Sequence, residues 1–157
     1  MDELTAAGIT DPDLRASYAE CKRLNSLHGK TYYLATLLLP PAKRPFVHAL
    51  YGFARYADEI VDDLASTLSD QEKAAHLKTW GDSVLASIST GISTDRVGAA
   101  LIDTVRRFNI PQQHFVDFLH SMTNPVLLSS AILRLKPFRS GSLLAWQRMA
   151  AMRRLIS

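Results

Sequence analysis

The chain has 157 residues, of which 47% are hydrophobic and 21% charged, values typical of one globular domain with a buried core. Its acidic start, Met1-Asp-Glu-Leu-Thr, lacks the apolar segment of a secretory signal, and no apolar run approaches the roughly 18 residues of a membrane span. We therefore expect a cytoplasmic protein. The single cysteine, Cys21, excludes an internal disulfide and a zinc site built on cysteines.

The pattern of caps and apolar residues predicts helices throughout, and no segment alternates as paired strands do. Met1–Thr10 is expected to be a frayed arm. Asp11 and Pro12 suit the N-cap and first position of a helix that ends near Gly29. Further helices are expected over 32–39, from Pro45, from a Ser69–Glu72 capping box to about Ser87, over 95–108 with Ser93 or Thr94 as cap, and from Pro111. The sequence therefore predicts an all-α helical bundle.

Polar side chains recur at helical spacing within Tyr51–Asp63, where a buried helix face should be apolar. With a step of about 100° per residue, Tyr51, Arg55, Asp58 and Asp62 fall on one stripe, and apolar residues cover much of the remaining surface. We therefore expect this helix to have protein on several sides and its carboxylates to face a cavity.

The carboxylates of this stripe fit a metal site. Two carboxylates one turn apart repel each other unless a cation lies between them. Mg²⁺ is usually held by one or two carboxylates together with phosphate oxygens of a substrate. We assign Asp58 and Asp62 as ligands, with Glu59 or Asp63 as auxiliaries, and Arg55 as a phosphate contact. The simpler alternative is a solvated helix end in which Arg55 pairs with Asp58 or Glu59.

The residues before the stripe form a second motif. The stretch from His28, which reads His-Gly-Lys-Thr-Tyr-Tyr-Leu-Ala-Thr-Leu-Leu-Leu-Pro-Pro, is followed by Val47-His-Ala-Leu-Tyr-Gly-Phe-Ala-Arg-Tyr-Ala-Asp-Glu-Ile-Val-Asp-Asp. Together they resemble the squalene/phytoene synthase family, and within it the bacterial phytoene synthases. The similarity is continuous from about Tyr18 to Asp63 and continues more weakly to about Thr123.

The resemblance implies a helical bundle of the isoprenoid synthase type. It also implies a prenyltransferase that joins two geranylgeranyl or farnesyl diphosphates head to head, with Mg²⁺ or, in its place, Mn²⁺. His28, Gly29 and Thr31 would meet the substrate phosphate, and Tyr32 and Tyr51 would lie near the isoprenoid chain. In the simpler interpretation His28 is only a C-cap and Thr31 only an N-cap.

The second aspartate-rich motif of the family is missing. Up to Asp117 the chain has 12 basic and 15 acidic residues, whereas the remainder has six basic residues and no acidic one. We therefore divide the chain into residues 1–123, the N-terminal part of an incomplete family domain, and 124–157, a basic tail that does not match. The tail fits an altered reading frame, a truncated paralogue or a fragment.

Two functions follow from this division. The first is phytoene synthase-like condensation in isoprenoid and carotenoid biosynthesis. The alternative is an inactive chain that binds a prenyl diphosphate or assembles with a partner. Peripheral contact with a membrane stays open, as does the oligomeric state. A helix over 142–155 would scatter Arg148, Arg153 and Arg154 around its circumference, which argues against nucleic acid as a partner.

Overall fold

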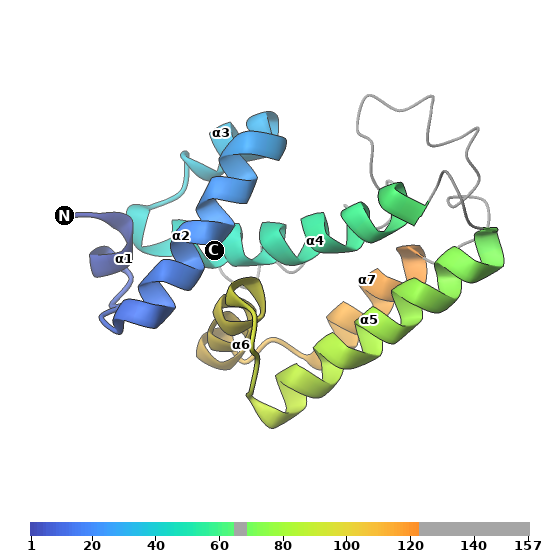
Figure 1. The fold of residues 1–157 in the computed structure, drawn as a ribbon. Helices are drawn as coiled ribbons and strands as arrows, with labels where there is room; N and C mark the ends of the chain where they lie inside the picture. The colour runs from blue at the N-terminus through green and yellow to red at the C-terminus, as the bar shows by residue number, and fades with distance from the viewer. Residues whose placement is uncertain (65–68, 123–157) are drawn as a thin grey trace.

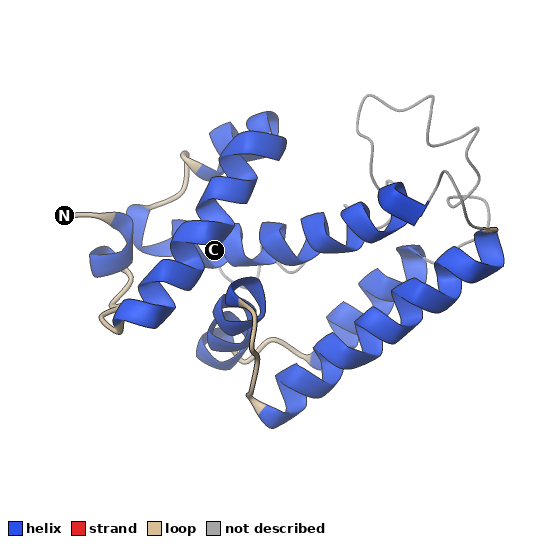
Figure 2. Ribbon diagram, viewed as in Figure 1, coloured by secondary structure: helices blue, strands red, loops and turns tan. Residues whose placement is uncertain are grey.

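The computed structural model describes residues 1–64 and 69–122, with the backbone alone for residues 61–64 and 70. Within these ranges every regular element is a helix (Figure 2), so the all-α prediction is confirmed. The basic tail lies outside the described residues. In chain order the elements are α1 (Glu3–Ala6), α2 (Pro12–His28), α3 (Lys30–Thr36), the short 3-10 helix η1 (Pro41–Lys43), α4 (Arg44–Leu64), α5 (Asp70–Thr90), α6 (Arg96–Phe108) and α7 (Gln112–Met122).

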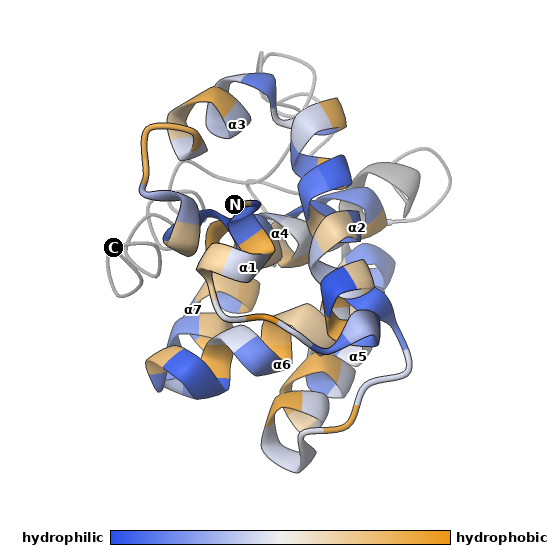
Figure 3. Ribbon diagram, turned by 90° about the vertical axis from the view of Figure 1, so that its left-hand side faces the viewer, coloured by the Kyte–Doolittle hydropathy of each residue, from blue (hydrophilic) through white to orange (hydrophobic). Residues whose placement is uncertain are grey.

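The long helix α4 is the centre of the bundle. In Figure 1, α2 crosses α4, and α5 runs beside α7 beneath it. Figure 3 looks along α4 and shows the other helices arranged around it. Phe53, which is 1% exposed, stacks on Trp80 of α5 and packs against Phe115 and Phe118 of α7. Burial of this aromatic cluster fixes the middle of α4 against the α5–α7 pair.

Most helix ends follow the signals in the sequence. The Asp11 carboxylate accepts a hydrogen bond from the Leu14 N–H, and α2 ends at Gly29. Ser69 and Glu72 form the expected capping box, although α5 continues three residues beyond the expected Ser87. None of the helices in the described ranges is long and apolar enough to cross a membrane.

The cap expected for α6 is wrong. Neither Ser93 nor Thr94 caps this helix. Asp95 does so, because its carboxylate accepts hydrogen bonds from the N–H groups of both Val97 and Gly98. A single carboxylate that satisfies two of the free amides at a helix start is a stronger cap than one hydroxyl.

The expectation of a frayed N-terminal arm is also wrong. Asp2 caps α1 and forms an ion pair with Arg15 of α2, with 3.1 Å between Oδ1 and Nη2. The Arg15 guanidinium also donates to the Ile9 carbonyl at 2.7 Å, and the Ile9 side chain is fully buried. Polar contacts to α2 and one buried apolar side chain therefore hold the arm to the bundle.

A buried hydroxyl joins α2 to α6. The Tyr18 hydroxyl donates to the Asp103 carboxylate at 2.7 Å and lies 2.9 Å from the Thr104 hydroxyl. Burial raises the pKa of Tyr18 far above its usual range, and the neighbouring Asp103 carboxylate raises it further. Tyr18 therefore stays protonated and serves as a structural donor between the two helices.

Candidate functional site

The polar stripe of α4 is largely buried. Tyr51 is 3% exposed and Asp58 is 4% exposed, and the Arg55 side chain between them retains 20% exposure. A carboxylate buried to this degree does not fit a solvated helix end, since a charge removed from water needs compensation by partners. The stripe therefore lies mostly inside the protein rather than on its surface.

The ion pair of the simpler interpretation is nevertheless present. The Arg55 Nε atom donates to Glu59 Oε1 at 3.3 Å, one helical turn away. Glu59 is more exposed than Arg55, at 39%, so this pair adds little stability. The pair can therefore open at small cost if another anion approaches Arg55, and the auxiliary metal role of Glu59 stays a prediction.

Asp62 and Asp63 lie in the last turn of α4, and their side chains are outside the described part of the structure. Among the residues whose side chains are described, no three His, Cys, Asp or Glu side chains are grouped as metal ligands. The donors that α4 offers in this region are carboxylate oxygens, which suit a hard cation such as Mg²⁺. The donor type of these residues therefore fits the expected ion, and the role of Asp58 as a ligand stays a prediction.

The junction between α2 and α3 approaches α4 closely at Tyr51. Gly29 ends α2 and also precedes the first residue of α3. A Cβ atom placed on Gly29 would lie 2.6 Å from the Cε2, Cζ and Oη atoms of Tyr51. Only glycine lets the backbone of this turn pass so close to the ring. The structure thus brings together Gly29 of one motif and Tyr51 of the other, two residues that are 22 positions apart in the sequence.

The other residues of the turn are placed differently. His28 is the last residue of α2 and is exposed, as is Thr31. The interpretation of Thr31 as an N-cap is wrong, because α3 begins at Lys30 and has no side-chain cap. Gly29 ends α2 and begins α3 with no intervening loop, so Thr31 already lies within the helix.

Two tyrosines pack between α3 and α4. The ring centroids of Tyr32 and Tyr51 are 5.4 Å apart, with an angle of 31° between the planes. Burial raises the pKa of Tyr51 to about 12, and the Arg55 guanidinium opposes this rise. Tyr51 is therefore protonated at neutral pH, and its ring presents an apolar face beside the Gly29 turn.

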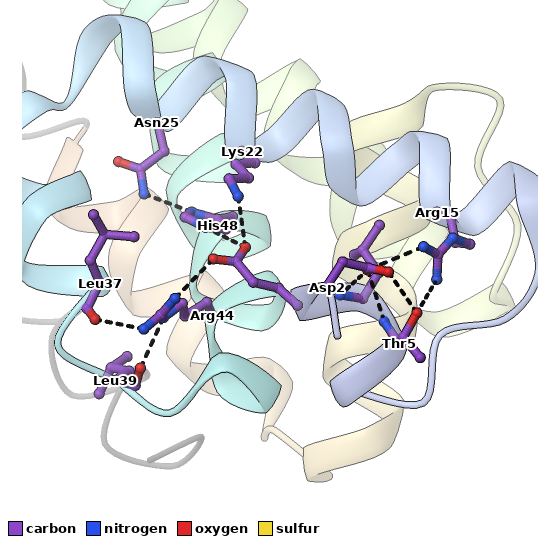
Figure 4. Close-up of polar contacts among 11 residues, drawn as sticks. Asp2, Thr5, Arg15, Lys22, Asn25, Leu37, Leu39, Arg44 and His48 are labelled. Carbon is purple, nitrogen blue, oxygen red and sulfur yellow. Dashed lines mark hydrogen bonds and ion pairs between the residues drawn. The ribbon is translucent and has the colours of Figure 1, made fainter.

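A buried polar cluster that the sequence did not reveal lies beside the site (Figure 4). Glu3 contacts Lys22 of α2 at 2.9 Å and Arg44 of α4 at 3.2 Å. Burial opposes ionisation of Glu3, but hydrogen bonds from Lys22 and Arg44 outweigh it and lower the pKa of the carboxyl. No local sequence signal points to this cluster, because Glu3 and Arg44 alone are 41 positions apart.

His48 belongs to the same cluster. It is 1% exposed, and its Nδ1 atom lies 2.9 Å from the amide nitrogen of Asn25. Because the amide donates there, the imidazole Nε2 atom carries the proton, and Nε2 is 3.9 Å from the Glu3 carboxylate. Burial lowers the pKa of His48 to about 4. The neutral imidazole ring is thus a buried structural member of this cluster.

Comparison with known proteins assigns these motifs to a family. Residues 26–130 match the model of the squalene/phytoene synthase family. The chain is 33% identical to the 15-cis-phytoene synthase of Synechococcus elongatus over 114 residues, which is 73% of this chain and 36% of that protein. It is 36% identical to the phytoene synthase of Arthrospira platensis over 103 residues, which is 66% of this chain and 32% of that protein.

A plant protein is similar to the same degree. The chain is 38% identical to the chloroplastic phytoene synthase 3 of Zea mays over 113 residues, which is 71% of this chain and 25% of that protein. The chain thus spans about a third or less of the length of these curated relatives. The family match includes both motifs and reaches seven residues past the expected boundary at 123.

Proposed function

The chain belongs to the squalene/phytoene synthase family, and we propose that it carries one half of a prenyl diphosphate site for Mg²⁺-dependent, head-to-head condensation of the phytoene synthase type. The observation that supports this proposal is the burial of Asp58 on the same stripe of α4 as Tyr51, which packs against the Gly29 turn. We propose geranylgeranyl diphosphate as the substrate, with farnesyl diphosphate as the shorter alternative.

The polar residues of α4 would hold the diphosphate end of the substrate. Asp58 and Asp62 would hold Mg²⁺, with Mn²⁺ as a substitute and Glu59 as an auxiliary ligand. The bound ion would act as a Lewis acid on the leaving diphosphate. Arg55 would donate to a phosphate oxygen after exchanging its exposed partner Glu59 for the stronger anion.

The turn and the tyrosines would hold the other side of the reacting centre. The seven-residue α3 is too short to contribute much of a helix dipole, so the role proposed for the turn rests on the position of Gly29 beside Tyr51. His28 and Thr31, which are exposed on either side of Gly29, would contact the phosphate from the turn itself. The Tyr32 and Tyr51 rings would shield the reacting carbon from water, as a reaction that develops positive charge on carbon requires.

A turnover assay tests this proposal. Purified chain is incubated with radiolabelled geranylgeranyl diphosphate and Mg²⁺, beside an Asp58→Asn, Asp62→Asn variant. The proposal expects labelled C40 product from the parent and none from the variant. Equal product from both proteins would contradict the assignment of the carboxylates.

A second candidate function has its own observation. The relatives are about three times as long as the part that this chain matches, and three leucines near α3 are exposed: Leu27 at 56%, Leu34 at 64% and Leu38 at 87%. A chain that binds the diphosphate without turnover, or that assembles with a partner supplying further helices, would explain both facts. Magnesium-dependent binding without product in the assay above supports this candidate over the first.

A further inference from the structure

The short helix α3 carries Tyr32 and follows the Gly29 turn, yet it is only seven residues long. A helix of this length is not stable alone, so tertiary contacts must set its position. Two ring contacts to α4 are evident: Tyr32 packs on Tyr51, and Tyr33 stacks on His48 with 5.8 Å between centroids. These contacts hold the first half of α3.

Arg44 holds the end of the same helix. Its Nη2 atom donates to the Leu37 carbonyl at 2.8 Å, and its Nε atom donates to the Leu39 carbonyl at 2.9 Å (Figure 4). The last carbonyls of a helix lack partners within the helix, and a cation near them is favourable. The planar guanidinium can satisfy two carbonyls at fixed geometry, which a lysine ammonium cannot do as well.

Glu3 in turn holds Arg44. The third contact of the guanidinium, from Nη1, is to Glu3 Oε1 at 3.2 Å. The other oxygen of Glu3 accepts from Lys22 at 2.9 Å and lies 3.9 Å from His48 Nε2. The Glu3 side chain is only 15% exposed. One carboxylate on α1 therefore contacts Arg44 directly and lies close to His48, the ring on which Tyr33 stacks.

We propose that Glu3 and Arg44 are positioning residues for the candidate site. Through them the N-terminal helix α1 fixes α3 against α4, and with α3 the Gly29 turn and Tyr32. The functional part of this inference rests on the proposed prenyl diphosphate site, whereas the mechanical part rests on the hydrogen bonds alone. The described polar contacts of the Glu3 and Arg44 side chains are to Lys22, His48 and the Leu37 and Leu39 carbonyls, besides each other, and none of these partners belongs to the stripe that would bind substrate.

The experiment compares Glu3→Gln, Arg44→Gln and the double variant with the full-length parent. A control variant, Tyr18→Phe, removes buried hydrogen bonds between α2 and α6 that do not involve α3. Two readouts are taken on each protein. The first is amide hydrogen exchange of residues 33–39, and the second is the dissociation constant of radiolabelled geranylgeranyl diphosphate with Mg²⁺.

Glu3→Gln should speed exchange over residues 33–39 by roughly tenfold, as expected when one charge-assisted hydrogen bond is lost. Diphosphate binding should weaken by several fold. The Tyr18→Phe control should lower the overall stability of the protein. Once exchange through global unfolding is subtracted, its amide exchange rates in α3 should equal those of the parent, and so should its dissociation constant for the diphosphate. Because Glu3 acts through Arg44, the double variant should be no worse than Arg44→Gln alone.

Three results separate the possibilities. Unchanged exchange in α3 overturns the inference. Faster exchange with unchanged diphosphate affinity overturns the positioning role, because α3 would then not matter for binding. If the parent itself fails to bind the diphosphate, the proposed function fails, and the exchange data alone decide whether Glu3 and Arg44 hold α3.

Discussion

The close approach of Gly29 to Tyr51 predicts that Gly29→Ala destabilises the protein by a steric mechanism. The new methyl carbon would lie 2.6 Å from three atoms of the Tyr51 ring, about 1 Å inside an optimal carbon contact. Tyr51 is 3% exposed and packs on Tyr32, so its ring has little room to move. The backbone φ of −122° at Gly29 is open to any residue, which leaves the clash as the main cost.

Overpacking of this kind lowers the free energy of unfolding by about 1–3 kcal/mol. Replacement of glycine by alanine also reduces the entropy of the unfolded chain, which raises the free energy of unfolding by about 0.4–1 kcal/mol. We therefore expect a net loss of about 1–2 kcal/mol in the free energy of unfolding, measured by urea denaturation followed by circular dichroism. In a Tyr51→Leu background the shorter side chain removes the clash, and Gly29→Ala should then be nearly neutral. An equal loss in both backgrounds would refute the steric explanation.

Two further predictions concern the N-terminal region. Burial lowers the pKa of His48 in the folded protein to about 4, whereas an ordinary histidine in the unfolded chain titrates near 6.5, so the unfolded chain binds more protons between these pH values and the folded protein loses stability as the pH falls. Urea denaturation should show that the free energy of unfolding falls by about 2 kcal/mol between pH 7.5 and pH 5 because of this group. A His48→Gln variant with the same pH dependence would contradict this. Ile9 is fully buried, so Ile9→Ala should lower the free energy of unfolding by about 2–4 kcal/mol. A loss below about 0.5 kcal/mol, the level of a surface substitution, would mean that the N-terminal arm is frayed.

Local signals predicted the helices well because each signal acts within a few residues. The Asp11-Pro12 start and the Ser69–Glu72 box are contacts between neighbours in sequence, so their residue types alone identify them. The prediction of Ser93 or Thr94 as the cap of α6 failed because Asp95, the adjacent residue, can serve as a cap equally well. Only the geometry of the loop selects the one whose oxygens reach two amides.

Long-range contacts could not be predicted in the same way. The arm over Met1–Thr10 was expected to be frayed, yet Glu3 has partners at positions 22 and 44. Charge alone does not say which distant residue will neutralise a carboxylate. The Gly29–Tyr51 approach was likewise hidden, since the resemblance marked both residues as functional without showing that they touch.

The candidate site was partly foreseen. Periodicity placed Tyr51, Arg55 and Asp58 on one stripe, and the structure shows that the stripe is mostly buried. Periodicity could not decide whether Arg55 would contact a bound ligand or a neighbouring acidic residue. Glu59 lies one helical turn after Arg55, so the same spacing fits an Arg55–Glu59 ion pair and a role for Glu59 as a metal ligand. The structure shows the Glu59 pair, and the metal role of the carboxylates remains a prediction.

Equilibrium binding of radiolabelled geranylgeranyl diphosphate is the most direct test of the central claim, that this chain carries a Mg²⁺-dependent prenyl diphosphate site. The parent is compared with the Asp58→Asn, Asp62→Asn double variant and with Asp82→Asn. The Asp82 variant makes the same substitution once, at an exposed carboxylate of α5 that pairs only with Lys78 among the described contacts. We expect the parent and the Asp82 variant to bind with Mg²⁺ and to lose the ligand in EDTA, while the double variant binds at least roughly tenfold more weakly, as for the loss of charge-assisted contacts. Binding by the parent that is unaffected by EDTA, or equal affinity of the double variant, would show that no such magnesium-dependent site exists on this helix.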